Sequence, residues 1–104
     1  MSEKFVSPCP LPEGYQREVL TVLIEECAEV QQRATKALRF GVDEVQPGQP
    51  LSNAARLSVE IGDLLEMIDV AERAGLLSTP HIEEGRGGKR GKLAKFMQTG
   101  RGHE

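Results

Sequence analysis

The sequence has little of what builds a large core or a metal cluster: its 104 residues include no tryptophan, one tyrosine, three phenylalanines, two cysteines and two histidines. Cys9 and Cys27 are too few for a disulfide framework, so we expect two free thiols. No apolar run approaches the roughly 20 residues that span a bilayer, which argues against a membrane protein. The N-terminus lacks a basic patch followed by an apolar stretch, so we expect no secretory signal and a cytoplasmic protein.

The formal net charge of −3 hides an uneven distribution. Residues 1–84 hold seven Lys or Arg against 15 Asp or Glu, whereas residues 85–104 hold six against one. An acidic body lacks the broad basic face with which proteins bind nucleic acid. We therefore expect no nucleic acid polymer among the partners, and the excess of carboxylates needs another explanation.

Six prolines leave two long proline-free stretches, 13–46 and 51–79. Proline inside a helix costs about 3 kcal/mol, so helices are expected within these stretches. In the first stretch, apolar residues recur at steps of three and four, which predicts an amphipathic helix over 14–40 that ends at Gly41 in a left-handed cap. Its apolar stripe comprises Val19, Leu23, Cys27, Val30, Ala34 and Leu38.

The second stretch predicts a helix over 53–74. Ser52 or Asn53 can cap its start by accepting a hydrogen bond from a free backbone amide, and Gly75 ends it. The apolar stripe of this helix comprises Leu57, Ile61, Leu64, Leu65, Ile68 and Ala71.

Beyond Pro80 the chain is rich in glycine, and each glycine costs a helix interior about 1 kcal/mol relative to alanine. Leu93, Phe96 and Met97 still form one short apolar face, so we predict a third, short helix over 89–98. Nothing indicates a strand of useful length. We predict a lead-in over residues 1–12, a helical domain over 13–98 and a flexible tail over 99–104.

The expected fold is all-α: an antiparallel hairpin of the two long helices, followed by the short C-terminal helix. With so few aromatic residues, a single copy buries too little apolar surface to be stable alone. We therefore expect a homodimer, or a dimer of dimers, whose helices form one larger bundle.

Five acidic residues are concentrated on the two long helices. The first carries Glu25, Glu26 and Glu29 within one arc of about 100°, and the second carries Glu60 and Asp63 within its apolar stripe. If that stripe faces the core, two carboxylates enter a region of low dielectric, where an uncompensated charge costs several kcal/mol. A compensating positive charge is therefore needed.

Two kinds of compensation are open. Arg33, Lys36 and Arg56 lie near the acids and predict some ion pairing, but three bases cannot easily neutralise five converging carboxylates. Carboxylates at i and i+3 on each of two facing helices also match the hard oxygen ligands of Mg²⁺. Zinc and di-iron sites are disfavoured, because His81 and His103 are the only histidines and neither has a suitable spacing.

The segments EECAEVQQRATKALRFG and NAARLSVEIGDLLEMIDV carry an EExxE motif followed by an ExxD motif. As a pair, they resemble the MazG-type, all-α nucleoside triphosphate pyrophosphohydrolase superfamily, in particular its small single-domain phage and bacterial members. The resemblance covers roughly residues 16–74. It implies Mg²⁺-dependent cleavage of a nucleoside triphosphate between its α and β phosphates, giving a nucleoside monophosphate and pyrophosphate, in the housecleaning of nucleotide pools.

The resemblance also implies roles for individual residues. The Mg²⁺ ligands would be Glu26, Glu29, Glu60 and Asp63, with Mn²⁺ able to replace Mg²⁺. Glu25 would belong with Glu26 and Glu29 to the catalytic group, either orienting a water or binding a further ion. The metal would polarise the phosphoryl oxygens while carboxylates position the attacking water.

Positive charge for a triphosphate is expected from Lys36 and Arg39 near the end of the first helix, from Arg56, and from Lys92 in the basic C-terminal segment. Three of them have a plainer interpretation. Lys36 and Arg56 can pair with neighbouring acids, and the C-terminal segment can be a solvated tail.

Two other functions are compatible with these residues. A non-catalytic helical dimer could bind nucleotide or a protein partner and keep the acids as a structural metal site. A plain helical interaction module would use neither metal nor nucleotide. The sequence determines neither the base and sugar of the nucleotide nor whether the role is housecleaning of damaged nucleotides or control of nucleotide pools.

Overall fold

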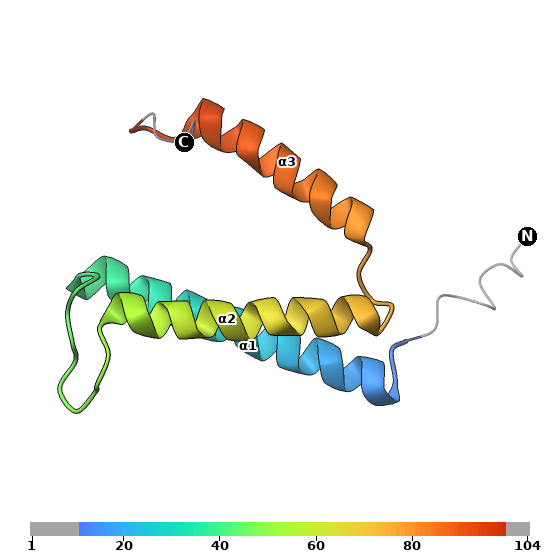
Figure 1. The fold of residues 1–104 in the computed structure, drawn as a ribbon, viewed down its shortest axis with the longest axis horizontal. Helices are drawn as coiled ribbons and strands as arrows, with labels where there is room; N and C mark the ends of the chain where they lie inside the picture. Colours follow the sequence, from blue (N-terminus) through green and yellow to red (C-terminus); the bar gives the residue numbers. More distant parts are fainter. Residues whose placement is uncertain (1–10, 100–104) are drawn as a thin grey trace, which may run out of the picture.

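The computed structural model describes residues 11–99 and contains, within that range, three α-helices and no strand. Helix α1 spans Gly14–Phe40, α2 spans Asn53–Arg73 and α3 spans Thr79–Phe96 (Figure 1). The all-α prediction is confirmed for these residues. The predicted bounds of the first two helices agree with the observed ones to within one residue.

Local residues explain where α1 ends and α2 begins. Gly41 follows α1 with a φ of 103° and a ψ of 145°, a backbone conformation that favours glycine. This conformation is not the left-handed helical cap that we predicted. Ser52 caps α2, because its side chain accepts a hydrogen bond of 3.2 Å from the backbone N–H of Ala55. Asn53 is the first residue of α2, and its side chain donates hydrogen bonds to Gly41 and Glu44 instead of capping the helix.

The predicted bounds of the third helix were wrong. Instead of a short helix over 89–98, α3 has 18 residues and begins ten positions earlier, at Thr79. Pro80 lies at the first or second helical position, where its missing N–H breaks no helical hydrogen bond. The glycines at positions 85, 87, 88 and 91 therefore lie inside the helix, and they weaken it without stopping it.

Helices α1 and α2 lie side by side and run in opposite directions (Figure 1). At one end, Gln16 Nε2 donates a hydrogen bond of 3.0 Å to the carbonyl of Ala74. At the other end, Asn53 Nδ2 donates one of 2.9 Å to the carbonyl of Gly41. Helix α3 leaves the end of α2 and diverges from this pair, so α1 and α2 alone position the candidate site.

A narrow seam joins α1 and α2. We use this term for Val19, Glu26, Arg33 and Ala37 of α1 and Asn53, Glu60 and Ala71 of α2. On each helix these residues lie within an arc of about 40°, and all of them are buried or half-buried. Small or uncharged residues occupy the two ends of the seam, whereas charged residues occupy its middle.

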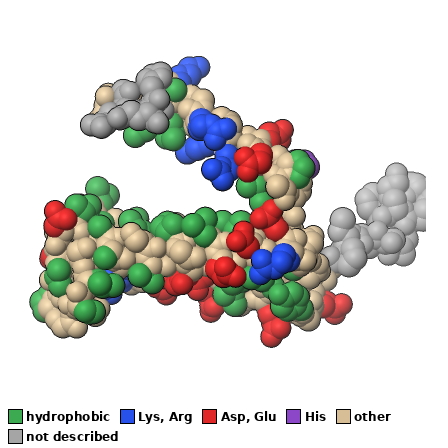
Figure 2. Space-filling model, viewed as in Figure 1, with side chains coloured by type: hydrophobic (Ala, Val, Ile, Leu, Met, Phe, Trp, Pro, Cys, Tyr) green, Lys and Arg blue, Asp and Glu red, His purple; other side chains and the backbone are tan. Residues whose placement is uncertain are grey.

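Much of the apolar stripe predicted on each long helix lies outside the seam. Leu38 is 87% exposed and Leu65 is 58% exposed, because one neighbouring helix covers only part of the apolar face. Hydrophobic side chains form a row along the side of the α1–α2 pair that faces α3 (Figure 2). A single copy therefore leaves a large apolar surface uncovered.

The predicted lead-in over residues 1–12 lies outside the described residues except for Leu11 and Pro12, and so does the predicted tail beyond Thr99. Cys9 also lies outside them, whereas Cys27 is a free, exposed thiol. Within residues 11–99, no helix combines the length and the hydropathy that crossing a bilayer requires.

Candidate metal centre

Three carboxylates converge at the middle of the seam. Glu26, Glu60 and Asp63 each place an oxygen within 4.8 Å of the other two. Glu26 comes from α1, whereas Glu60 and Asp63 are one turn apart on α2, so both helices are needed to assemble the cluster. Glu26 and Glu60 are half-buried. Asp63 is exposed, so of the two acids on α2 only Glu60 is partly buried.

The surroundings oppose ionisation of two of these groups. Partial burial raises the pKa of Glu26 above its ordinary value of 4.5, and the negative charges of Asp63, Glu29 and Glu25 raise it further. Burial also raises the pKa of Glu60, together with a hydrogen bond to Asp63 and the charges of Glu29, Asp63 and Glu26. The cluster therefore concentrates negative charge that its protein neighbours leave uncompensated.

One oxygen of the cluster has no partner. Glu26 Oε2 is buried and accepts no hydrogen bond. A buried, unpartnered carboxylate oxygen is costly unless a cation or a donor satisfies it. The donor set consists of carboxylate oxygens alone, which suits Mg²⁺ or Mn²⁺ and does not suit zinc. The residues present therefore fit a hard divalent cation.

The basic residues near the cluster do not neutralise it, so the expected ion pairing was wrong. Between residues 11 and 99 the ion pair that forms is Arg73 with Glu66, 3.8 Å apart and exposed on both sides. Arg56 instead donates from Nη1 to Gln46 Oε1 at 2.7 Å. Arg33 is only 8% exposed, and its Nη1 has no hydrogen-bond partner.

Glu25 and Glu29 lie beside the cluster rather than in it. Both are exposed, and neither belongs to the group of three converging carboxylates. Glu29 is nevertheless close enough for its charge to raise the pKa of both Glu26 and Glu60, whereas the charge of Glu25 acts on Glu26. The predicted four-carboxylate ligand set thus appears as three converging groups with Glu29 next to them.

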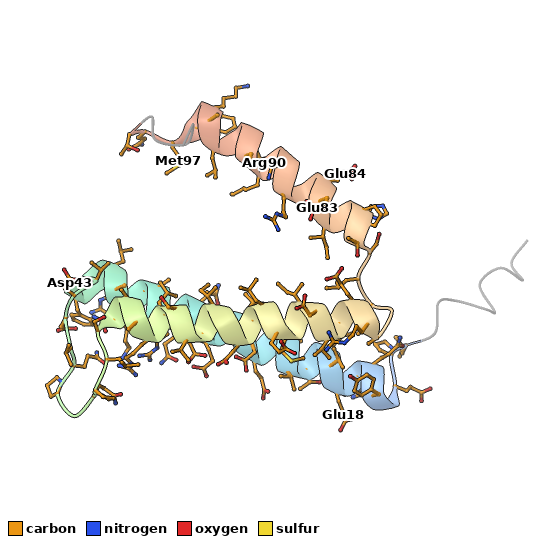
Figure 3. The ribbon with its side chains drawn as sticks, viewed as in Figure 1. Glu18, Asp43, Glu83, Glu84, Arg90 and Met97 are labelled. Atoms are coloured by element: carbon orange, nitrogen blue, oxygen red, sulfur yellow. The ribbon has the colours of Figure 1, made fainter. Side chains whose placement is uncertain are left out.

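The predicted phosphate-binding residues are dispersed. Lys36 and Arg39 line one shallow depression of about 600 Å³ on α1, and the Arg39 guanidinium lies 5.0 Å from the centre of the Phe40 ring. Lys92 lies in the part of α3 that diverges from the α1–α2 pair. Figure 3 shows Arg90, two residues earlier, on this diverging helix. The described chain therefore does not bring Lys92 to the carboxylates.

Sequence reasoning missed the burial of Arg33. Val19, Glu26 and Arg33 are spaced by seven residues, which is the spacing of positions that face a neighbouring helix in a two-helix packing. That periodicity was the available signal, and it was obscured because two of the three residues are charged.

Comparison of the chain with models of known protein families, with characterised proteins and with solved structures finds no match. A functional assignment therefore rests on the geometry of the carboxylate cluster and on the two acidic motifs that form it.

Proposed function

We propose that this protein is a Mg²⁺-dependent nucleoside triphosphate pyrophosphohydrolase that takes part in housecleaning of nucleotide pools. The observation that carries the proposal is the convergence of Glu26, Glu60 and Asp63 from two helices within 4.8 Å, with a buried, unpartnered oxygen on Glu26. The EExxE and ExxD motifs that resemble the MazG-type superfamily contain these same residues.

Glu26, Glu60 and Asp63 would hold the ion, and Glu29, whose charge is close enough to raise the pKa of Glu60, would complete the set. When bound, Mg²⁺ supplies Lewis acidity toward the phosphate oxygens and lowers the pKa of a coordinated water. The carboxylates otherwise repel a triphosphate, so the same ion that they bind is needed for the substrate to approach.

The remaining residues act on water and phosphate. Glu25 and Glu29 are exposed beside the cluster, where a carboxylate can orient a water and accept its proton. The water oxygen forms a bond to the α phosphorus, the bond to the bridging oxygen breaks, and pyrophosphate leaves. Arg56, one turn before Glu60 on α2, would offer positive charge for the phosphates, whereas Lys36 and Arg39 line a separate depression on α1.

We also propose that the active form is a homodimer or a dimer of dimers. In the described chain, only Val19, Ala37 and Ala71 are buried apolar residues, whereas large apolar side chains such as Ile24, Leu38 and Leu65 are exposed. A second copy covering these faces would supply the missing core. Light scattering on the purified protein tests this, and a monomer at all concentrations would contradict it.

The proposed reaction is tested by incubating the protein with Mg²⁺ and a panel of canonical and modified ribo- and deoxyribonucleoside triphosphates. Release of pyrophosphate together with monophosphate is expected for the wild type. Glu60→Gln removes one ligand charge and should lower kcat at least about a hundredfold, since the metal contributes several kcal/mol of transition-state stabilisation.

Glu66→Gln is the matched control, because Glu66 is an exposed acid on the same helix and makes only a surface ion pair. Its activity should equal that of the wild type. If no nucleotide yields pyrophosphate while Mg²⁺ still stabilises the fold, the non-catalytic metal-binding dimer is the better description. If Mg²⁺ changes neither activity nor stability, the protein is better described as a plain helical interaction module.

A further inference from the structure

The loop between α1 and α2 forms a pocket that shares a wall with the carboxylate cluster. The pocket has a volume of about 190 Å³ and is lined by Gln49, Pro50, Leu51, Arg56, Val59 and Glu60. Glu60 links the two features, because it lines the pocket and also contributes an oxygen to the cluster. A molecule bound in the pocket therefore lies directly beside the candidate metal centre.

The loop that builds the pocket is tied to the start of α2. The backbone N–H groups of Asn53 and Ala54 donate to the carbonyls of Glu44 and Val42, each at 2.9 Å. The side chain of Asn53, only 2% exposed, also donates to Glu44 Oε1 at 2.9 Å. These bonds join the first half of the loop to the helix that carries Glu60.

The tip of the loop is a tight turn that also holds Arg56. The backbone N–H of Gln49 donates to the Gln46 carbonyl at 3.0 Å, with Pro47 and Gly48 between them. Gly48 has a φ of 82°, as the third position of a type II turn requires. The Gln46 side chain accepts the hydrogen bond from Arg56, so the turn and the arginine are fixed relative to each other. The pocket is thus preformed.

The size of the pocket limits what it can hold. A volume of 190 Å³ is about that of six water molecules at roughly 30 Å³ each, and it is smaller than the roughly 300–1,000 Å³ of pockets that enclose a whole ligand. It accommodates one planar ring system and not a complete nucleotide. The charged remainder of such a ligand must extend out of the pocket.

The chemistry of the lining matches a nitrogen heterocycle. Pro50, Leu51 and Val59 offer apolar surface for the faces of a ring. The Gln49 amide supplies both a donor and an acceptor for the ring edge. Arg56 uses one N–H to bind Gln46, and its other N–H groups can donate to the ring edge.

We infer that this pocket receives the base of the nucleotide, while the phosphates extend past Glu60 to the carboxylate cluster. This assignment rests on the proposed function. It implies that Gln49 and Leu51 above all determine which base the protein prefers. Both side chains line the pocket and neither belongs to the carboxylate cluster.

The pocket can be tested without catalysis. Isotope-labelled wild-type protein in EDTA is titrated with adenosine, guanosine, cytidine and uridine and their deoxy forms, and amide chemical shifts are followed by NMR. At least one nucleoside should shift amides of residues 46–60. Ribose 5-phosphate, which has no base, is the control and should leave those amides unchanged. Equal shifts with ribose 5-phosphate, or none with any nucleoside at millimolar concentration, would overturn the inference.

A kinetic test uses Gln49→Ala and Leu51→Ala, with Gln98→Ala as the control of the same type, beyond the end of α3. Each loop variant should lower kcat/KM for the preferred nucleotide about tenfold or more and change the ratio between purine and pyrimidine substrates. Their melting temperatures should stay close to that of the wild type, because both substitutions are in a loop. Gln98→Ala should change neither quantity.

The two ideas can fail separately. If the wild type hydrolyses no nucleotide but nucleosides shift residues 46–60, the proposed reaction is wrong and the base pocket stands. If hydrolysis occurs while nucleosides shift nothing there and the loop variants behave like Gln98→Ala, the reaction stands and the pocket assignment is wrong.

Discussion

A carboxylate oxygen of Glu26 on α1 lies within 4.8 Å of one from Glu60 on α2, in the middle of the seam that holds the two helices together. At one end of this seam the buried residues Val19 and Ala71 are apolar. The helices therefore attract each other at that end and repel each other at the carboxylates. Because a bound divalent cation would remove the repulsion, metal binding and folding stability should be linked.

Mg²⁺ should raise the melting temperature, and EDTA should reverse the effect. Binding to the folded state alone stabilises it by about 2.7 kcal/mol when the free ion is at 100 times its Kd. Differential scanning calorimetry over a series of Mg²⁺ concentrations measures this. Glu26→Gln should abolish the response, while Glu18→Gln, an exposed acid on the same helix, should retain it. A full response in Glu26→Gln would place the ion elsewhere.

The metal-free protein should become more stable as the pH falls from 7 toward 4.5. Because partial burial and neighbouring charges raise the pKa of Glu26 and Glu60 in the folded state, that state binds protons more tightly than the unfolded chain does. Stability contributed by these groups is therefore lost as the pH rises through the raised pKa values. Melting temperatures in EDTA at successive pH values measure the trend.

With Mg²⁺ present the trend should reverse, because protons compete with the ion for the carboxylates. Glu60→Gln should weaken the pH dependence in EDTA, whereas Glu66→Gln should leave it as in the wild type. A metal-free melting temperature that falls steadily from pH 7 to pH 5 is the result that contradicts this prediction.

Arg33→Met should stabilise the metal-free protein by about 1 kcal/mol. The Nη1 donor of Arg33 is buried without a partner, and such a donor costs about 1–3 kcal/mol. The opposing effect is small, because Arg33 is not among the groups whose charge shifts the pKa of Glu26 or Glu60. Methionine can fill the vacated space.

Urea denaturation in EDTA measures the change, and Arg17→Met is the matched control. Arg17 is exposed, so its replacement should alter the free energy of unfolding by less than about 0.5 kcal/mol. A clear loss of stability in Arg33→Met would show instead that the guanidinium is paired with an acid in solution.

Asn53→Ala should destabilise the protein by about 1–3 kcal/mol and loosen the loop. The side chain of Asn53 donates to the Gly41 carbonyl and to Glu44 Oε1, both at 2.9 Å, and its loss removes two partly buried hydrogen bonds. Urea denaturation and amide hydrogen exchange of residues 42–52 measure the two effects. Gln31→Ala, at an exposed position of α1, should change neither, and equal behaviour of the two variants would contradict the structural role of Asn53.

The long helices could be predicted because their signals are local. The apolar periodicity of each helix, the glycine at position 41 and the cap at Ser52 act within a few residues of one another. The start of α3 was missed for an equally local reason. The glycines at positions 85, 87 and 88 argue against a helix before position 89, yet α3 begins at Thr79 with Pro80 in its first turn, where proline is tolerated.

The candidate site was predictable only in part. Angles along each helix place Glu26 and Glu29 on one arc and Glu60 and Asp63 on another, and those angles depend on sequence alone. Which carboxylates meet depends on the register and rotation of α1 against α2. That register brings Glu26, rather than Glu29, into the group with Glu60 and Asp63.

By itself, the sequence determined the two long helices and the acidic positions on each, since hydrogen bonds and side-chain spacing within one helix are short-range. The tertiary structure alone decided that Nη1 of Arg33 is buried without a hydrogen-bond partner, that Lys92 lies on a diverging helix, and that the loop lines a pocket beside Glu60. These features depend on contacts between residues far apart in the chain, and the spacing within one segment carries no information about such contacts.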